Sequence, residues 1–251
     1  MERPPASLEP DEWAAGCSLE WPGTWNARDL GGIPTIAGRL AERTLIRSDS
    51  LQHVDRSGWD VVMSHGVRTL VDLRNRDQAV LEPQFPPDGI ETRSVPLEQD
   101  LAGDPEFDSW ARRQWLATPL YFERFVSRWP QRCAEAVEAI VDAEPGGVLV
   151  HCGRGTDRTG LIIALVLELV GADRRFIVED YLLSTVRLRS GRARRLGRRD
   201  DDALIRSVYR DQKTTPSESL LGFLDLTAGG AVASALGGET VVELGRRLVA
   251  A

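Results

Sequence analysis

The sequence predicts an α/β fold, in which a central and mostly parallel sheet is flanked by helices and followed by a small helical C-terminal region. Two apolar runs, at residues 67–73 and 148–150, are typical of buried strands, because strands of a parallel sheet are covered on both faces. Segments with helical periodicity alternate with these runs, as in other α/β domains. A hydrophobic content of 42% and a charged content of 27% are ordinary for a globular protein.

The first half of the chain begins with a proline-containing segment and ends in a long loop. We expect residues 1–20 to form a flexible N-terminal arm. Residues 75–108 are rich in proline, glycine and acids and are predicted to be loop, with one strand near residues 92–97. Between these segments the pattern predicts a turn at Gly31 and Gly32, a strand at 43–49, a helix that ends on Gly66 and the strand at 67–73.

In the second half, Cys133, Val137 and Ile140 recur at helical spacing. A strand and two more helices follow, then a charge block at residues 187–202 and a tail with apolar periodicity. We therefore divide the chain into the arm (1–20), a core (21–190), and a charged connection with C-terminal helices packed on the core (191–251). The predicted helices lie at 131–144, 158–171 and 173–188, and the strand lies at 148–150.

The charge balance limits the class of partner. The formal net charge is -7, and a field of that sign repels nucleic acids and anionic membrane surfaces. We therefore expect no nucleic-acid partner. An anionic substrate would have to be attracted by a local positive site.

Targeting signals and metal ligands are sparse. The first residues hold no apolar run, and the most apolar segment, at 161–171, is too short to span a bilayer and contains Glu168. We expect a cytoplasmic protein without stable membrane insertion. The chain has 3 cysteines, widely spaced, and 3 histidines, which predicts neither a disulfide framework nor a metal site. No metal and no cofactor are expected.

The stretch HCGRGTDRTG, residues 151–160, lies between the strand at 148–150 and the helix at 158–171. Its glycines let successive N–H groups face inward as an anion-binding nest, and the start of the helix adds its positive dipole end. That field favours the thiolate of Cys152, and the planar fork of Arg158 fits two phosphate oxygens. The predicted phosphate-binding residues are Gly153, Arg154, Gly155, Thr156, Asp157 and Arg158.

This stretch resembles the HCxxGxxR(S/T)G signature of the protein-tyrosine-phosphatase superfamily. The DRTG ending is similar to that of bacterial tyrosine/lipid phosphatases, whose loop reads HCxxGKDRTG and which open with an N-x-RDLGG element. The resemblance covers roughly residues 24–188. The matching positions are His151, Cys152, Gly155, Arg158, Thr159 and Gly160 in the loop, and Asn26, Arg28, Asp29, Leu30, Gly31 and Gly32 in the opening element.

The resemblance implies covalent catalysis, in which Cys152 attacks phosphorus while Arg158 and the loop N–H groups stabilise the equatorial oxygens. The subfamily points to Asp157 as general acid. Asp72 is the first reserve, and Asp104 and Asp108, in the acidic loop at 100–108, are the others. RWPQR (Trp129 and Pro130) resembles the WPD loop of larger relatives, but glutamine stands where the aspartate would be.

Other residues of these motifs receive supporting or structural roles. We expect His151 to orient the thiolate, and Thr159 and Asp72 to support the loop. Thr156 stands where the subfamily has lysine, which weakens the case for lipid substrates. We also expect Arg28 and Asp29 to fix the N-terminal segment to the sheet by an ion pair, and Cys17 and Cys133 to have packing roles.

The leading interpretation is a protein-tyrosine phosphatase with dual specificity as an extension, which acts on a phosphorylated protein or a small phosphomonoester. A phosphoinositide phosphatase, a phospho-ligand-binding module with little turnover, and arsenate reduction or sulfur transfer are the alternatives. Arsenate reduction needs resolving thiols, and neither Cys17 nor Cys133 stands in a motif for that role. The physiological substrate, a lid and the oligomeric state stay open at this point.

Overall fold

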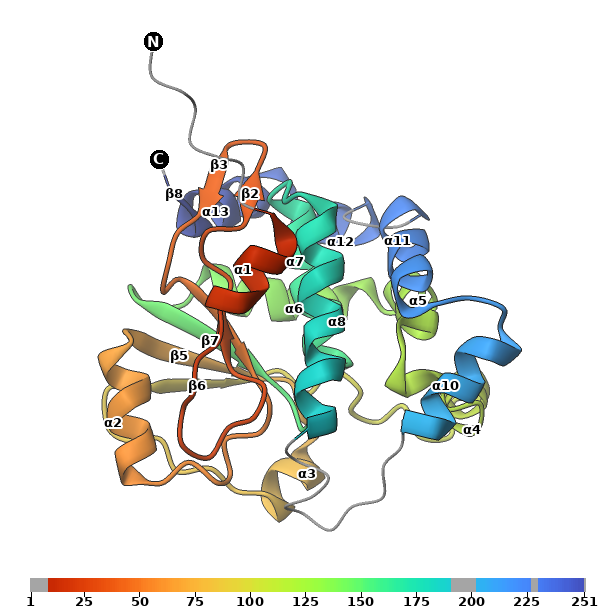
Figure 1. Cartoon of the computed structure of the whole chain (residues 1–251), viewed down its shortest axis with the longest axis horizontal. Helices are drawn as coiled ribbons and strands as arrows, with labels where there is room; N and C mark the ends of the chain where they lie inside the picture. The colour runs from red at the N-terminus through yellow and green to blue at the C-terminus, as the bar shows by residue number, and fades with distance from the viewer. Residues whose placement is uncertain (1–8, 191–201, 227–229, 251) are drawn as a thin grey trace.

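The computed structural model describes residues 9–190, 202–226 and 230–250, and its centre is a five-stranded sheet (Figure 1). The strand order is β1-β4-β7-β5-β6, with β1 antiparallel to β4 and the other neighbours parallel. The predicted α/β fold with a mostly parallel sheet is therefore confirmed. The strands are β1 (Arg28–Asp29), β4 (Leu45–Ser48), β5 (Val67–Asp72), β6 (Glu91–Ser94) and β7 (Gly147–His151).

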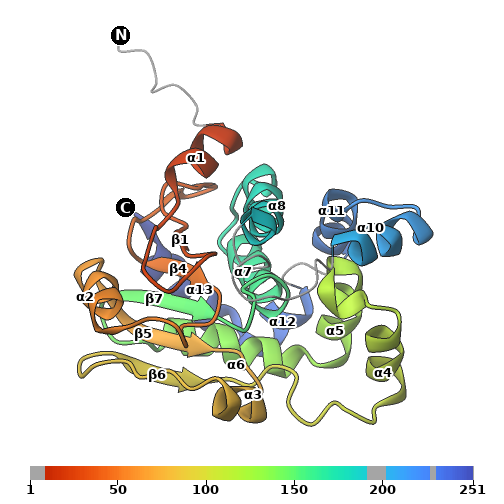
Figure 2. The same cartoon turned by 60° about the horizontal axis from the view of Figure 1, so that its bottom comes forward.

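The parallel strands all end at one edge of the sheet. His151, the last residue of β7, pairs with Ser48 of β4 on one side and with Asp72 of β5 on the other, and Asp72 pairs in turn with Ser94 of β6. Figure 2 shows the arrowheads of β5, β6 and β7 pointing the same way, with helix α3 (Arg76–Leu81) beyond the end of β6. Segments that follow these strands thus meet at the edge where ligands bind in open α/β sheets.

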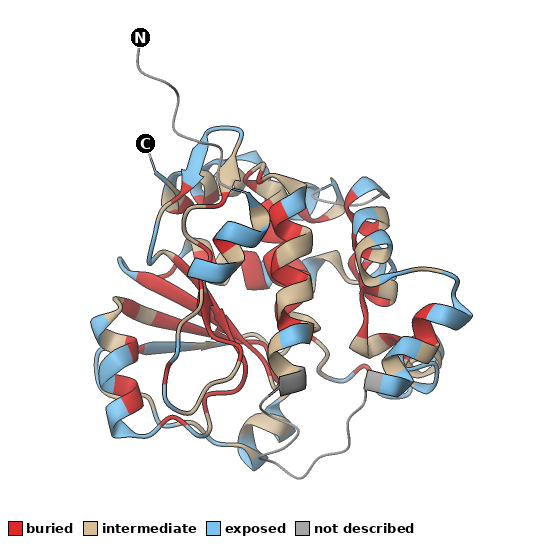
Figure 3. Cartoon of the chain, viewed as in Figure 1, coloured by how far each residue is buried: buried red, intermediate tan, exposed pale blue. Residues whose placement is uncertain are grey.

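Helices cover both faces of the sheet because successive strand residues point to opposite sides. Helix α2 (Arg56–Ser64) lies on one face, where Leu70 of β5 and Leu149 of β7 join its apolar residues in one cluster. Val71 and Val148 face the other way and pack with α6 and α7. Strands β4, β5 and β7 are almost entirely buried, whereas the edge strand β6 and the outer surface of α2 are largely exposed (Figure 3). The helices on the second face are α6 (Pro130–Val141), α7 (Arg158–Leu169) and, outside α7, α8 (Arg174–Ser190).

The region predicted as loop over residues 75–108 is only partly irregular. The strand near residues 92–97 is β6, but α3 and the start of α4 (Pro105–Arg112) also fall in this range, so the prediction of loop is wrong there. Helix α3 begins with a capping box formed by Asn75 and Gln78. Helix α4 begins at the N-cap Asp104, and its Phe107 and Trp110 pack into an aromatic cluster. Two 3-10 turns (Trp115–Ala117 and Pro119–Tyr121) and α5 (Phe122–Arg128) complete that cluster.

The prediction of a flexible arm over residues 1–20 is wrong for its second part. Residues 10–16 form helix α1 (Pro10–Gly16), and the Trp13 indole is 4% exposed. Its Nε1 donates a hydrogen bond to Gly31 O at 3.1 Å, and its ring meets Phe176 of α8 edge-on. Burial of the indole between these two contacts fixes helix α1 in place. The prolines of this segment, on which the prediction of a flexible arm is based, give no sign of that burial. Residues 1–8 of the predicted arm lie outside the described residues.

The C-terminal tail is helical, as expected, and it packs on α6 and α8. Its last residues also form β8 (Val249–Ala250), which pairs with β3 (Gly38–Leu40) in a small sheet with β2 (Pro34–Thr35); two residues are too few for a sequence pattern to predict. Most of the charge block at 187–202 lies outside the described residues. The helices are α10 (Asp202–Asp211), α11 (Pro216–Leu226), α12 (Gly230–Leu236) and α13 (Gly238–Leu248).

In the described part of the chain, no single helix is both long and apolar enough to cross a membrane. One bent pair, Pro216–Asp225 with Gly230–Leu236, meets that test only when its two helices are counted together.

Candidate active site

The loop from Cys152 to Asp157 joins β7 to α7 at the edge where the parallel strands end. Gly155 has φ +71°, and a Cβ there would lie 2.4 Å from the Ser48 carbonyl oxygen, so both the backbone conformation and the close approach require glycine. The Gly155 N–H donates to Cys152 Sγ at 3.3 Å. Cys152 itself is 2% exposed. The sulfur thus lies at the base of a curled loop, under a backbone donor.

Arg158, the first residue of α7, carries its guanidinium back over this loop. A Cβ on Gly153 would lie 3.9 Å from Nη2 of Arg158. Burial would lower the pKa of Arg158, but the nearby charges of Cys152 and Glu98 outweigh it, so the pKa stands above its usual value. The guanidinium of Arg158 therefore lies beside the loop that carries Cys152.

Two residues that the sequence analysis missed hold the Arg158 side chain. Gln78 of α3 accepts a hydrogen bond from Nη1 at 2.6 Å, and a carboxylate oxygen of Glu98 lies 3.5 Å from Nε. Burial raises the pKa of Glu98, although the charge of Arg158 opposes the shift. The capping box at Asn75 was the available signal for Gln78. Glu98 follows β6, so its place after a predicted strand was a signal too.

Asp157 lies at the N-cap position of α7 but makes no side-chain capping bond. Its Oδ1 is buried and has no hydrogen-bond partner among the described residues. Burial raises the pKa of this carboxyl, against the opposing charges of Arg154, Arg158 and Arg47. A carboxyl in this environment keeps its proton to a higher pH than an ordinary aspartate does.

Asp72, the first reserve candidate for the acid, lies in the opposite environment. Its carboxylate receives hydrogen bonds from Nε and Nη2 of Arg74, at 2.9 and 2.7 Å, and from the Arg74 backbone N–H. Burial would raise the pKa of Asp72, but the charge of His151 and the contacts of Arg74 lower it below its usual value. Such a group is held as carboxylate. The other two candidates belong to the start of α4: Asp104 caps it, and Asp108 accepts from the Gly103 N–H.

The His151 ring is fully buried beside Asp72. Its Nε2 lies 3.4 Å from Nε2 of Gln84 and 3.9 Å from a carboxylate oxygen of Asp72. Burial lowers the pKa of His151 to about 4, so the imidazole is neutral at pH 7 and is charged only at acidic pH, where Asp72 titrates. These contacts position the ring against Asp72 and Gln84, and its predicted action on the thiolate stays a prediction.

The two threonines of the loop region are buried. Thr156 is 8% exposed and Thr159 is fully buried, and neither hydroxyl has a hydrogen-bond partner among the described residues. Thr156 brings no charge to the position where the resembling loops have lysine. The supporting role of Thr159 likewise stays a prediction.

Arg28 and Asp29 both have structural contacts, as predicted, but their partners lie outside the sheet. Arg28 Nε donates to Asp180 of α8 at 2.7 Å, whereas Asp29 lies 3.0 Å from His65 Nε2 and accepts from the Gly31 N–H. Neighbouring residues of a strand point to opposite faces, which separates the two side chains.

The two other cysteines are core residues, as predicted. Cys17 and Cys133 both belong to the main hydrophobic cluster. Burial raises the pKa of both, to about 11 for Cys17. In the described part of the chain, no group of three or more His, Cys, Asp or Glu side chains is gathered as a metal site.

Comparison with known proteins gives matches over most of the chain. A model of the tyrosine phosphatase family matches residues 19–229. The triple specificity protein phosphatase PtpB of Mycobacterium tuberculosis is 33% identical over 233 residues, which cover 81% of this chain and 83% of that protein. A tyrosine-protein phosphatase of Nostoc commune is 27% identical over 151 residues, which cover 55% of this chain and 47% of the relative.

Proposed function

The chain belongs to the tyrosine phosphatase family, and from this premise we propose which residues carry the reaction. It is a cysteine-dependent phosphatase, which hydrolyses phosphomonoesters through a phosphocysteine intermediate. Its substrates are therefore phosphorylated molecules. The proposal assigns Cys152 as the nucleophile, Arg158 and the loop amides as the phosphate clamp, and Asp157 as the general acid.

In the first step the Cys152 thiolate attacks phosphorus in line with the bond to the leaving oxygen. The new S–P bond forms as that P–O bond breaks, and the proton of Asp157 goes to the leaving oxygen. Arg158 and the inward N–H groups hold the three equatorial oxygens, where charge gathers in the transition state. Burial supports the role of Asp157, because it raises the pKa of the carboxyl that must donate.

In the second step water attacks the phosphocysteine. Asp157, now a carboxylate, takes a proton from the water, the S–P bond breaks, and inorganic phosphate leaves with the thiolate restored. No outside oxidant or reductant enters either step.

One observation carries the assignment: the sulfur of Cys152 accepts a hydrogen bond from the Gly155 N–H at 3.3 Å, while the guanidinium of Arg158 lies beside the same loop, 3.9 Å from where a Cβ of Gly153 would be. A buried cysteine with only a packing role does not need both an amide donor and an arginine. Cys17 and Cys133, which pack in the core, show the contrast.

We propose phosphotyrosine as the main substrate group, and phosphoserine, phosphothreonine and phosphoinositides as extensions. Broad specificity is supported by the Mycobacterium tuberculosis relative, which is named a triple specificity protein phosphatase. Thr156 removes a positive charge from the loop, which favours singly phosphorylated substrates. We also propose residues 21–190 as the catalytic core, with the C-terminal helices packed on it. A cytoplasmic location is also part of the proposal.

The test compares Cys152→Ser with the wild-type chain on an aryl phosphate. We expect vanadate-sensitive hydrolysis by the wild type, and loss of turnover to the uncatalysed background in the variant, because a serine hydroxyl at this site is a far weaker nucleophile than a thiolate. Cys17→Ser is the matched control. Among the described residues its sulfur donates one hydrogen bond, to Ala14 O, and a hydroxyl can do the same. Full activity of Cys152→Ser would refute the assignment.

A further inference from the structure

The loop from Cys152 to Asp157, which we call the phosphate loop, is held by hydrogen bonds from other segments to its backbone carbonyl oxygens. Three successive carbonyls accept hydrogen bonds from segments that precede the loop by more than 100 residues. The donors come from the N-terminal segment, from β4 and from the residues that follow β4. Ser50 N donates to Gly153 O at 3.2 Å, Asn26 Nδ2 donates to Arg154 O and Gly155 O at 3.2 Å each, and Arg47 Nη2 also donates to Gly155 O.

These contacts determine where the loop N–H groups point. A trans peptide is planar, and its C=O and N–H point in opposite directions. When the carbonyls of residues 153–155 face the scaffold, the N–H groups of residues 154–156 face the other side. The Gly155 N–H does so, since it donates to Cys152 Sγ at 3.3 Å. The outer contacts therefore orient the amides that receive phosphate.

The Asn26 amide is itself held in one orientation. Its Oδ1 accepts a hydrogen bond from Arg28 Nη1 at 2.7 Å, which leaves Nδ2 to face the loop. Its backbone N–H donates to Asp49 Oδ1 at 2.9 Å. The side chain is fully buried, so no water competes for its donors.

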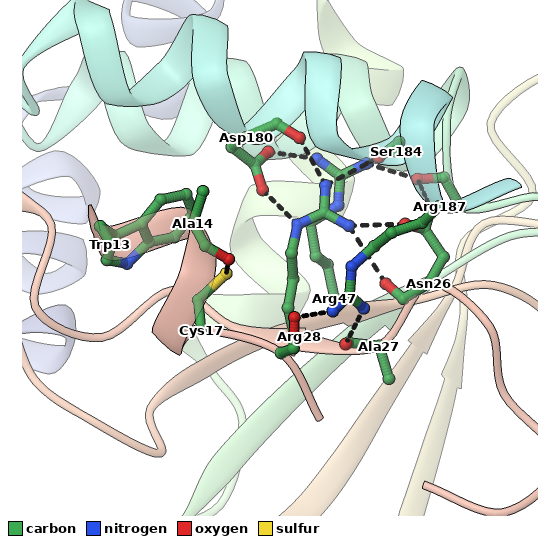
Figure 4. Close-up of polar contacts among 12 residues, drawn as sticks. Trp13, Ala14, Cys17, Asn26, Ala27, Arg28, Arg47, Asp180, Ser184 and Arg187 are labelled. Carbon is green, nitrogen blue, oxygen red and sulfur yellow. Dashed lines mark hydrogen bonds and ion pairs between the residues drawn. The ribbon is translucent and has the colours of Figure 1, made fainter. Parts of the chain in front are cut away.

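Arg47 and Arg28 are joined by one carboxylate of α8 (Figure 4). Asp180 accepts from Arg28 Nε at 2.7 Å through one oxygen and from Arg47 Nη1 through the other. The Ser184 hydroxyl, one turn later on α8, accepts from both arginines, at 2.7 and 3.2 Å. Both arginines are fully buried and Asp180 is 2% exposed. A buried guanidinium needs such a complete set of partners.

Arg47 remains charged in this setting. Burial and the charge of Arg28 lower the pKa of Arg47 to about 10, while Asp180 opposes the shift. At pH 7 the group is therefore a cation. Its charge lies directly behind the loop, and charges act more strongly in the protein interior than in water.

We propose that Arg47 and Asn26 are positioning residues for phosphate binding, held in place by Arg28 and Asp180. The inference rests on the proposed function and extends it to residues outside the signature loop. They touch neither the phosphoryl group nor the sulfur. They act by holding the carbonyls of residues 154 and 155, so that the amides face the phosphate before it binds and no reorganisation is needed during the reaction.

The test uses Arg47→Lys and Asn26→Ala in the full chain, with Arg247→Lys as the matched control. Lysine keeps the charge at position 47 but cannot bond Asp180 and Gly155 O with one planar fork. Arg247 also donates to three backbone carbonyls, but these lie at residues 143, 144 and 146, before β7 rather than after it. For each protein we would measure kcat, KM, the inhibition constant of inorganic phosphate and the thermal midpoint.

We expect Arg47→Lys and Asn26→Ala each to weaken inhibition by phosphate and to lower kcat/KM by about 10-fold or more. Supporting residues have effects of this size at other sites. Arg247→Lys should lower the thermal midpoint while phosphate inhibition stays at the wild-type value. An unchanged phosphate constant in a folded Arg47→Lys would overturn the proposal, whatever its thermal midpoint. Asn26→Ala decides the same question if the lysine variant does not fold, because it removes two donors and no charge.

Failure of this proposal can be told from failure of the proposed function. If the wild type hydrolyses aryl phosphate and Cys152→Ser does not, the function stands, and the phosphate constants then judge the positioning role alone. If the wild type shows no hydrolysis, the function is refuted, and this inference, which rests on it, is overturned too.

Discussion

The backbone of the phosphate loop and the guanidinium of Arg158 are held in different ways. Behind the loop, the contacts are made by fully buried groups such as Asn26 and Arg47, and they end on main-chain carbonyls. In front of it, Gln78 and Glu98 contact the side chain of Arg158, the proposed phosphate ligand, and the Glu98 side chain is 14% exposed. We call these the back and the front of the site.

The difference indicates a division of labour. A buried network of main-chain contacts has one arrangement, because any alternative leaves a polar group or a charge unsatisfied. A partly exposed side chain can exchange its partner for water or for a ligand oxygen at small cost. The back therefore fixes the geometry of the amides, and the front adjusts how firmly Arg158 holds phosphate.

The largest expected effect is at the back. Gly155→Ala would combine a left-handed backbone, φ +71°, with a Cβ 2.4 Å from the Ser48 carbonyl. We expect the free energy of unfolding to fall by about 3 kcal/mol, from roughly 1–2 kcal/mol of backbone strain and a similar cost of overpacking. Activity should be lost, because β4 and the loop must separate. Chemical denaturation and aryl phosphate turnover measure the two effects.

Gly32→Ala separates the two causes. Gly32 has φ +82° but nothing within 4 Å of a built Cβ, so only the backbone cost remains. It should lose about 1–2 kcal/mol and keep its turnover. If Gly155→Ala and Gly32→Ala lost the same free energy of unfolding and the same turnover, the conclusion that the back of the site is tightly fixed would be contradicted.

Next in size is the contrast between two carboxyls, Asp157 in the loop and Asp72 beside Arg74. We expect Asp157→Asn to lower kcat by about 10²- to 10⁴-fold on a phosphotyrosine substrate, the usual contribution of a general acid. Asp72→Asn should keep most of its kcat but lose about 3 kcal/mol of stability at neutral pH, because it breaks a buried ion pair of Arg74. If Asp72→Asn lost more kcat than Asp157→Asn, the assignment of Asp157 as general acid would be wrong.

The two variants should also respond to pH with opposite signs. The pKa of Asp72 is lowered in the folded chain, so its carboxylate stabilises the fold above the unfolded pKa, and that gain disappears as the pH falls through the folded value. The pKa of Asp157 is raised, so its ionisation opposes folding as the pH rises. Asp157→Asn should therefore be more stable than the wild type at neutral pH, and Asp72→Asn less stable. Unfolding midpoints test both signs if they are measured from about pH 2 to pH 7, because the Asp72 contribution disappears below the ordinary aspartate pKa and the Asp157 contribution appears above it.

The sequence predicted the loop better than its surroundings, for a physical reason. Strand, loop and helix are continuous over residues 147–169, so local patterns specify their order. Arg47 and Asp180 meet only because β4 pairs with β7 and α8 packs on α7. The one local sign of this ion pair was Arg47 itself, because an arginine inside the buried run LIRS needs a partner. Gln78 was missed because its six-residue helix is too short for a periodicity to stand out.

The smallest expected effect is at the front and comes from Glu98→Gln. The amide keeps the shape of the side chain but removes the charge that faces Arg158 Nε at 3.5 Å. At that distance the contact is weaker than a hydrogen bond of 2.9 Å, and Gln78 still holds Nη1. We expect KM to change by about threefold, kcat to change less, and the thermal midpoint to stay close to wild type. A loss of kcat as large as that of Asp157→Asn would show that Glu98 acts in proton transfer, and the front of the site would then take part in the chemistry itself.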